Sequence, residues 1–168
     1  MQLDLAFVDE TTLDNAERKA IGSLLPERWE QYYPGTWERA WSQRAPTYRL
    51  VGSVGGVVVA NQSIFDVTVD VPAFGLGDLA VHPDYQHSGI ARALVQVTVA
   101  DLRERTDALI LTSSGTEHVR ALFFALGFQI VPEAALDFVV PPGDANQFDW
   151  LSSPPIASDI PLRVLAPC

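Results

Sequence analysis

A glycine-containing loop between a predicted strand and a predicted helix carries the clearest chemical signal in this chain. Gln86, Gly89 and Ala91 have the spacing Gln-x-x-Gly-x-Ala, in a segment that follows Pro83 and leads into an amphipathic run. The first turn of a helix has unpaired backbone N–H groups and the positive end of the helix dipole, so such a junction binds anions. Glycine has no Cβ and lets a phosphate group come close to the backbone. We therefore predict a diphosphate site here.

The same segment resembles the acyl-CoA-binding motif of the GNAT N-acetyltransferase superfamily, Arg/Gln-x-x-Gly-x-Gly/Ala after a strand ending in Val-x-Pro. The resemblance implies that loop amides hold the pyrophosphate of coenzyme A and that the strand backbone pairs with its pantetheine arm. The cofactor contacts then fall on Leu79, Ala80, Val81, Gln86, His87, Ser88, Gly89, Ile90, Ala91 and Arg92. An ordinary strand-turn-helix connection without a ligand is the alternative interpretation.

A second segment, residues 120–128, resembles the other GNAT hallmark, Ala-x-x-Leu-Tyr-x-x-x-Gly-Phe. Leu122, Gly127 and Phe128 match it, and Phe123 stands where many members have a tyrosine that protonates the departing thiolate. We expect Phe123 to contact the cofactor, although it cannot serve as an acid because it has no hydroxyl. The alternative is a simple amphipathic core helix. If this is an enzyme, water or another hydroxyl group must supply the proton: Tyr85, Ser113 or Ser114.

Acyl transfer to an amine also requires a base, because a lysine-like amine has a pKa of about 10. Asp78 is the first candidate, since it directly precedes the strand residues expected to contact pantetheine. GNAT enzymes often have a carboxylate on or near this strand. Glu30 and His118 are the other candidates, and Asp78 could instead be an outward-facing strand residue. The aromatic side chains of residues 29–41 could line an acceptor pocket or simply pack in the core.

Composition limits the function classes. The chain has 168 residues with a formal net charge of −10 and a sequence pI near 4.5. This charge disfavours nucleic acid and favours a cationic amine, unless it only maintains solubility. Cys168 is the only cysteine, so no internal disulfide is possible, and no Cys/His set has metal-ligand spacing. No apolar run reaches membrane-spanning length. We expect a cytoplasmic protein without a metal or a membrane partner.

The sequence predicts a single α/β (α+β) domain at residues 1–140 and a proline-rich extension at 141–168 that packs on this domain or on a partner subunit. The resemblance implies a mixed, mostly antiparallel sheet of about six or seven strands, with splayed fourth and fifth strands and four main helices. Gly75 and Gly77 predict a bulge or a close backbone approach in the fourth strand. The expected strands are 3–8, 47–53, 57–65, 74–81, 108–111 and 136–140, the last completing the core sheet. The expected helices are 14–25, one carrying Trp37 and Trp41, 88–105, and one between Thr116 and Gly127.

These features together predict an acyl-CoA-dependent N-acyltransferase that moves an acetyl group from acetyl-CoA to a small-molecule primary amine by direct attack. Residues 45–49 and the proline-rich tail are faintly similar to aminoglycoside 2′-acetyltransferases and nodulation N-acyltransferases, which would make the acceptor an amino sugar. A noncatalytic domain that binds acyl-CoA as a sensor or regulator is the alternative, because Phe123 replaces the usual acid. Residues 160–164 could add a strand to a partner in a homodimer.

Overall fold

The computed structural model describes residues 2–24, 46–66, 73–105, 109–114, 117–130, 136–138, 149–152 and 162–164. The chain forms two compact units. The first unit comprises Met1–Phe65 and Gly77–Val95, and the second comprises Asp66–Leu76 and Gln96–Cys168. Strand β4 and helix α4 each contribute to both units.

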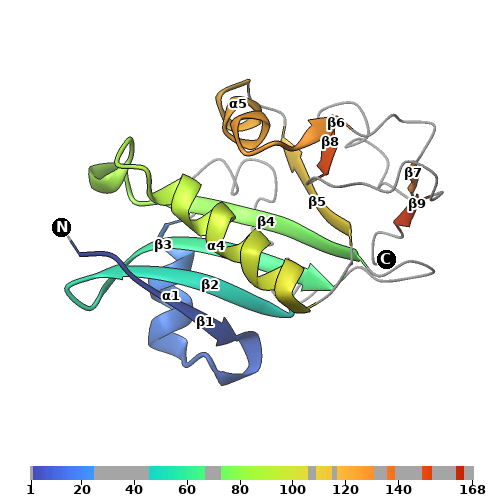
Figure 1. Cartoon of the computed structure of the whole chain (residues 1–168). Helices are drawn as coiled ribbons and strands as arrows, with labels where there is room; N and C mark the ends of the chain where they lie inside the picture. The colour runs from blue at the N-terminus through green and yellow to red at the C-terminus, as the bar shows by residue number, and fades with distance from the viewer. Residues whose placement is uncertain are drawn as a thin grey trace. The chain divides into compact units, whose positions relative to one another are not determined.

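The first unit is built on antiparallel strands. Strands β1 (Asp4–Asp9), β2 (Tyr48–Val54) and β3 (Val57–Asp66) lie side by side in that order, and the C-terminal half of β4 (Ala73–Val81) follows β3 (Figure 1). The predicted turn at Gly55 and Gly56 joins β2 to β3, and both glycines have positive φ angles, of 58° and 81°. A left-handed turn of this kind suits glycine and matches the twist of a hairpin.

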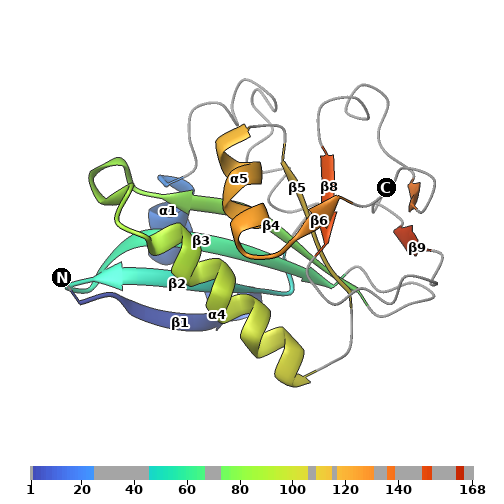
Figure 2. The same cartoon turned by 45° about the horizontal axis from the view of Figure 1, so that its top comes forward.

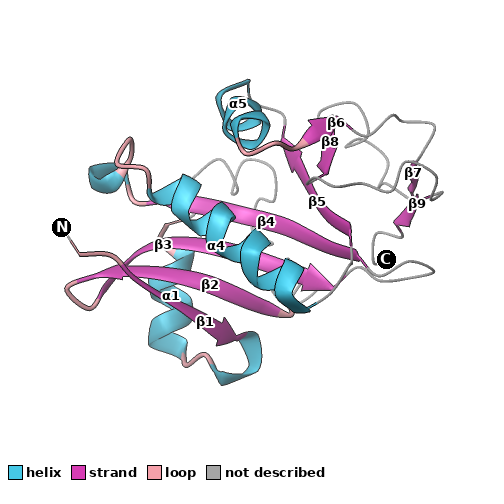
Figure 3. Cartoon of the chain, in the orientation of Figure 1, coloured by secondary structure: helices cyan, strands magenta, loops and turns pink. Residues whose placement is uncertain are grey.

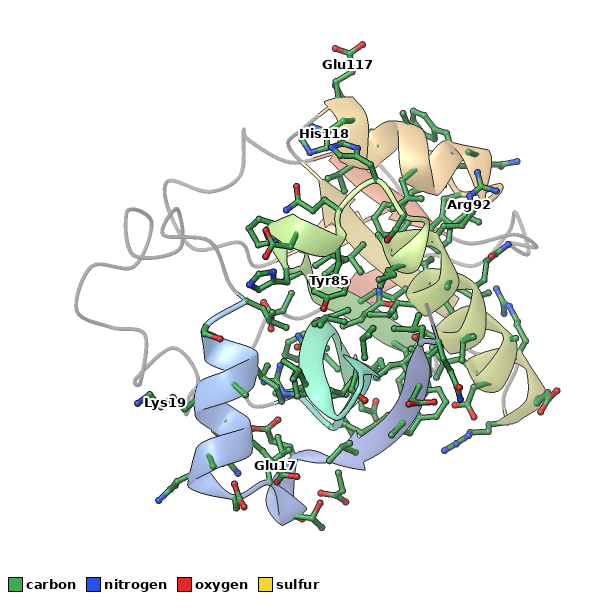
Figure 4. The ribbon with its side chains drawn as sticks, turned by 90° about the vertical axis from the view of Figure 1, so that its left-hand side faces the viewer. Glu17, Lys19, Tyr85, Arg92, Glu117 and His118 are labelled. Carbon is green, nitrogen blue, oxygen red and sulfur yellow. The ribbon has the colours of Figure 1, made fainter. Side chains whose placement is uncertain are left out.

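Helix α1 (Asn15–Gly22) is shorter than the predicted 14–25. A capping box starts it: the Asp14 side chain accepts from the Glu17 N–H, and the Glu17 side chain accepts from the Asp14 N–H. Figure 4 shows Glu17 and Lys19 on this helix, and both side chains are exposed. The buried side is formed by Ile21 and Leu24.

The second unit contains a parallel strand pair. The N-terminal half of β4 pairs with β5 (Leu109–Ser114), from Ala73↔Leu109 to Leu76↔Thr112. Strand β8 (Asp149–Ser152) pairs antiparallel with β5 and with β6 (Gln129–Ile130), and β5 and β8 lie side by side in Figure 2. Helix α4 (Ile90–Arg105) connects β4 to β5, as the predicted parallel crossover requires. The predicted mixed α/β architecture is confirmed.

The last predicted core strand, 136–140, is wrong in its partner. Strand β7 (Leu136–Phe138) pairs in parallel with β9 (Leu162–Val164) in a separate two-stranded sheet. Strand β8 lies beside β5 instead, although it belongs to the segment predicted as an extension. Side-chain periodicity identifies a strand but does not identify the strand with which it pairs.

The helices of the described residues are α1, α4 and α5 (Glu117–Ala125), with short 3₁₀ turns η1 (Glu10–Thr12) and η2 (Pro83–Tyr85) (Figure 3). Helix α4 begins at Ile90, two residues later than predicted. The expected helix carrying Trp37 and Trp41 lies outside the described residues, as do Glu30 and the neighbouring aromatic side chains. Within the described part of the chain, no helix is long and apolar enough to cross a membrane.

Candidate active site

The predicted anion loop joins η2 to α4 in the first unit, and it appears in pink before α4 in Figure 3. Gly89 has a φ of 86° and directly precedes the first residue of α4. A Cβ placed on Gly89 would have no heavy atom within 4 Å, so the space beside its Cα is open. Residues Gln86 to Gly89 are all exposed. An incoming anion can therefore reach the backbone of this loop.

Two side chains of the motif hold the loop in shape. The Gln86 side-chain amide donates to the Val81 carbonyl at 3.1 Å, and the Ser88 hydroxyl donates to the Tyr85 carbonyl. The Gln86 backbone N–H donates to the Pro83 carbonyl at 3.2 Å. Gln86 is therefore engaged within the loop itself, and ligand binding depends on the amides that follow it.

The start of α4 suits a pyrophosphate. The first-turn N–H groups of a helix have no acceptor within the helix. This first turn contains no acidic side chain, and Arg92 within it is exposed (Figure 4). The 16-residue helix adds the positive end of its dipole. The loop thus provides local positive potential and close access in a chain of strongly negative net charge, which is what a diphosphate group needs.

Asp78 has an unusual backbone conformation within β4. Its φ is 49°, in the left-handed region, which costs an L-residue roughly 1–2 kcal/mol. The adjoining Gly77 has no room for a side chain, since a Cβ there would lie 2.9 Å from the Phe65 ring. The close backbone approach predicted from the glycines is confirmed at Gly77, and the strand is distorted at the next residue.

Two side chains of β3 hold Asp78. The Ser63 hydroxyl donates to Asp78 Oδ2 at 2.7 Å, and the Asn61 side-chain amide donates to the Asp78 backbone carbonyl at 3.0 Å. Both donors are fully buried, whereas Asp78 itself is half-buried. Among the described residues, Ser63 is the donor to this carboxylate, through one oxygen. The carboxylate is therefore oriented by the protein but has a partly open side.

A buried charge network continues behind Ser63. Arg49 Nη1 donates to the Ser63 hydroxyl at 2.7 Å, and Arg49 Nε donates to Glu10 Oε2 at 2.6 Å. Glu10 Oε1 also accepts from Arg18 Nη1 at 2.8 Å. Sequence reasoning missed these residues. The available signal was the polar run Asn61, Gln62 and Ser63 in an otherwise apolar strand, because such groups enter a core only with hydrogen-bond partners.

Phe123 lies in the second unit, on α5. Its side chain is 1% exposed, and its ring packs edge-on against Phe128 with a centroid distance of 4.9 Å. The Phe128 N–H donates to the Phe123 carbonyl, and Gly127 has a φ of 86° where the helix ends. These contacts explain the Gly-Phe pair of the second motif as a helix stop and a core contact. The packing assigns Phe123 a structural role in addition to the predicted cofactor contact.

The remaining candidates are placed as follows. His118 is exposed in the first turn of α5, and Ser113 and Ser114 lie in β5. His82 accepts from the Asp84 N–H through Nδ1 and packs edge-on against Tyr85, which gives both a role in shaping η2. In the described part of the chain, no three His, Cys, Asp or Glu residues gather where they could hold a metal ion.

Comparison with known structures shows the same fold. The chain is similar to *Escherichia coli* ElaA, with a TM-score of 0.68 and 14% identity over 90% of this chain and 99% of that one. It is also similar to the *Escherichia coli* GNAT family N-acetyltransferase YhbS in complex with CoA, with a TM-score of 0.65 and 22% identity over 89% and 81% of the two chains. Aminoglycoside 6′-acetyltransferase type Ii gives 0.67 and 15%, covering 89% and 96%.

No curated protein sequence matches this chain significantly. The family model described as "Acetyltransferase (GNAT) family" matches residues 14–128, which include the anion loop, Asp78 and the second motif. This match covers more than half of the 168 residues, and the solved structures have the corresponding fold. The chain therefore belongs to the GNAT acetyltransferase family.

Proposed function

We propose that the protein is an acyl-CoA-dependent N-acyltransferase that transfers an acetyl group from acetyl-CoA to the primary amine of a small molecule. The observation that carries this proposal is the pairing, within one unit, of an open glycine loop at a helix start with an oriented carboxylate. Gly89 provides the close approach for a diphosphate. Asp78 presents its carboxylate from β4, the strand that leads into the loop.

In this mechanism, backbone groups bind the cosubstrate. The amides from His87 to Arg92 hold the pyrophosphate, and the backbone of Leu79 to Val81 pairs with the pantetheine amides. Ile90 is buried and anchors the helix start, while Ala91 keeps the first turn narrow. A backbone N–H of β4 polarises the thioester carbonyl as negative charge develops on its oxygen.

Asp78 acts as the general base. It removes a proton from the acceptor ammonium group, directly or through water, and the neutral nitrogen then attacks the thioester carbon. The C–N bond forms, the C–S bond breaks, and the thiolate leaves with a proton taken from water. The partly open side of the carboxylate is the one that would face the amine, because Ser63 holds the other oxygen.

We place the acceptor among small cationic amines, because the chain has a net charge of −10. An amino sugar is the more specific candidate. The similar fold of an aminoglycoside 6′-acetyltransferase is compatible with this choice. A homodimer and a cytoplasmic location remain predictions from the sequence.

The competing function is a noncatalytic acyl-CoA sensor. It is favoured by Phe123, which has no hydroxyl and is packed against Phe128 in the core. Such a domain would bind acetyl-CoA without transferring its acetyl group.

One experiment separates the two functions. Calorimetry measures acetyl-CoA binding, and a colorimetric thiol reagent measures CoA release with a panel of amino sugars, polyamines and amino acid amides. Release that depends on an added amine, with mass-spectrometric detection of the acetylated product, supports the enzyme. Tight binding without release across the panel supports the sensor, and no binding contradicts both functions.

A further inference from the structure

Asn61 on β3 holds one peptide group of β4. Its side-chain Nδ2 donates to the backbone carbonyl of Asp78 at 3.0 Å, and the Asn61 side chain is fully buried. In a trans peptide the carbonyl and the following N–H point in opposite directions. Since the Asp78 carbonyl points toward Asn61, the N–H of Leu79 points to the side of β4 away from β3.

Ser63 holds the side chain of the same residue. Its hydroxyl donates to Asp78 Oδ2 at 2.7 Å and accepts from Arg49 Nη1 at 2.7 Å. The Arg49 guanidinium is fixed in turn by Glu10, at 2.6 Å. One anchor from β3 therefore grips the backbone of Asp78, and a second grips its carboxylate.

These two anchors explain how an aspartate keeps a φ of 49° within a strand. Such a conformation persists in an L-residue only where the surroundings enforce it. Asn61 and Ser63 supply that enforcement with rigid geometry, because both are buried in a ladder whose neighbours Gln62 and Ile64 are buried as well. The distortion is a property of β3 as much as of Asp78.

We propose that Asn61 and Ser63 are positioning residues for acyl transfer. Asn61 aims the Leu79 N–H at the thioester carbonyl, and Ser63, supported by Arg49, aims the free oxygen of Asp78 at the amine. This inference rests on the proposed function. It assigns the alignment of the electrophile and of the base to adjacent side chains of one strand, two residues apart.

The first test is Asn61→Asp, which keeps the size of the side chain and removes its N–H donor. We expect kcat to fall at least tenfold with acetyl-CoA affinity unchanged within about threefold, because the anion loop is untouched. The exposed Leu79-independent control is Asn15→Asp at the start of α1, where kcat should not change. An Asn61→Asp variant that is folded, binds acetyl-CoA and keeps kcat within twofold would overturn the role of Asn61.

The second test asks whether Ser63 acts through Asp78. Ser63→Ala alone should lower kcat severalfold and leave acetyl-CoA affinity unchanged. In the Asp78→Gly background, which tolerates a positive φ but has no carboxylate, adding Ser63→Ala should cause no further loss. Equal losses in both backgrounds would overturn the role of Ser63. This pair also serves if Asn61→Asp does not fold.

A third readout does not require turnover. In ¹⁵N-labelled protein, Asn61→Asp should shift the Leu79 amide resonance and reduce its further shift on addition of acetyl-CoA. If the wild-type protein binds acetyl-CoA but acetylates no amine, the proposed enzyme function fails while this resonance still tests the position of the peptide. An unchanged Leu79 response in the variant would contradict the positioning role in either case.

Discussion

Arg49 on β2 and Glu10 on η1 form an ion pair with Nε and Oε2 2.6 Å apart, and the two side chains are only 1% and 6% exposed. Glu10 also pairs with the half-buried Arg18, so one carboxylate serves two guanidinium groups. Through Ser63 the pair reaches the candidate base Asp78. A structural charge network and a catalytic candidate thus share one hydrogen-bonded chain.

Removing the carboxylate of Glu10 should strongly destabilise the protein. Glu10→Ala deletes the acidic partner of a fully buried arginine, and losing one partner of a buried ion pair costs about 3–5 kcal/mol. Urea unfolding should show this loss in the free energy of unfolding. Asp101→Ala is the control: its partner Arg105 is 58% exposed, so the loss should stay under about 1 kcal/mol. Equal effects of the two substitutions would contradict a special role for the buried pair.

Asp78→Asn should separate base catalysis from backbone geometry. Asparagine tolerates a positive φ and can still accept the Ser63 hydrogen bond, but it cannot take a proton from the amine. We expect kcat to fall by about 10²-fold at neutral pH, and the deficit to shrink as the pH rises toward the amine pKa of about 10, where solvent deprotonates the acceptor.

The control for this substitution is Asp84→Asn, which changes an exposed carboxylate in η2. Its pH–rate profile should follow that of the wild-type protein. A loss in Asp78→Asn that is constant with pH would make Asp78 a positioning residue. Full activity would remove it from the mechanism and direct attention to Glu30 or His118.

Gly89→Glu should abolish coenzyme A binding without unfolding the protein. A Cβ at this position meets nothing within 4 Å, so the new carboxylate extends into the space proposed for the pyrophosphate. The positive φ of 86° adds about 1 kcal/mol of strain to any L-residue. Calorimetry should show no binding.

Two alanine variants isolate the charge effect at Gly89. Gly89→Ala carries the strain without the charge and should weaken binding less than Gly89→Glu. Gly56→Ala carries a similar strain, at a φ of 81° in the β2–β3 turn, and should leave affinity unchanged. If Gly89→Glu binds coenzyme A as tightly as the wild-type protein, the anion site is elsewhere.

Phe123→Tyr tests the missing acid. The ring is 1% exposed, so the added hydroxyl must find a partner or cost about 1–3 kcal/mol, which thermal unfolding will detect. We expect coenzyme A affinity to stay within a few-fold and turnover to rise or barely change. Phe124→Tyr, on the exposed side of the same helix, is the control. A large loss of affinity in Phe123→Tyr alone would show that the site needs an apolar wall at Phe123.

The sequence by itself predicted the order of most elements and the position of the anion loop. The reason is local: the spacing from Gln86 to Ala91 and the glycine at 89 are determined by neighbouring residues in the chain. Helix boundaries were predicted within a few residues, because caps such as Asp14 and stops such as Gly127 act over one turn. Asp78 was singled out from its place before Leu79, without its left-handed backbone.

The tertiary structure alone decided which strand pairs with β5 and what surrounds Asp78. Strand β8 rather than residues 136–140 lies beside β5, because hydrogen bonding between strands depends on how distant segments meet. The contacts of Asp78 with Ser63, and of Arg49 with Glu10, span 15 and 39 positions along the chain. No periodicity relates residues so far apart, and only the antiparallel pairing of β1, β2, β3 and β4 brings their polar side chains together in one buried layer.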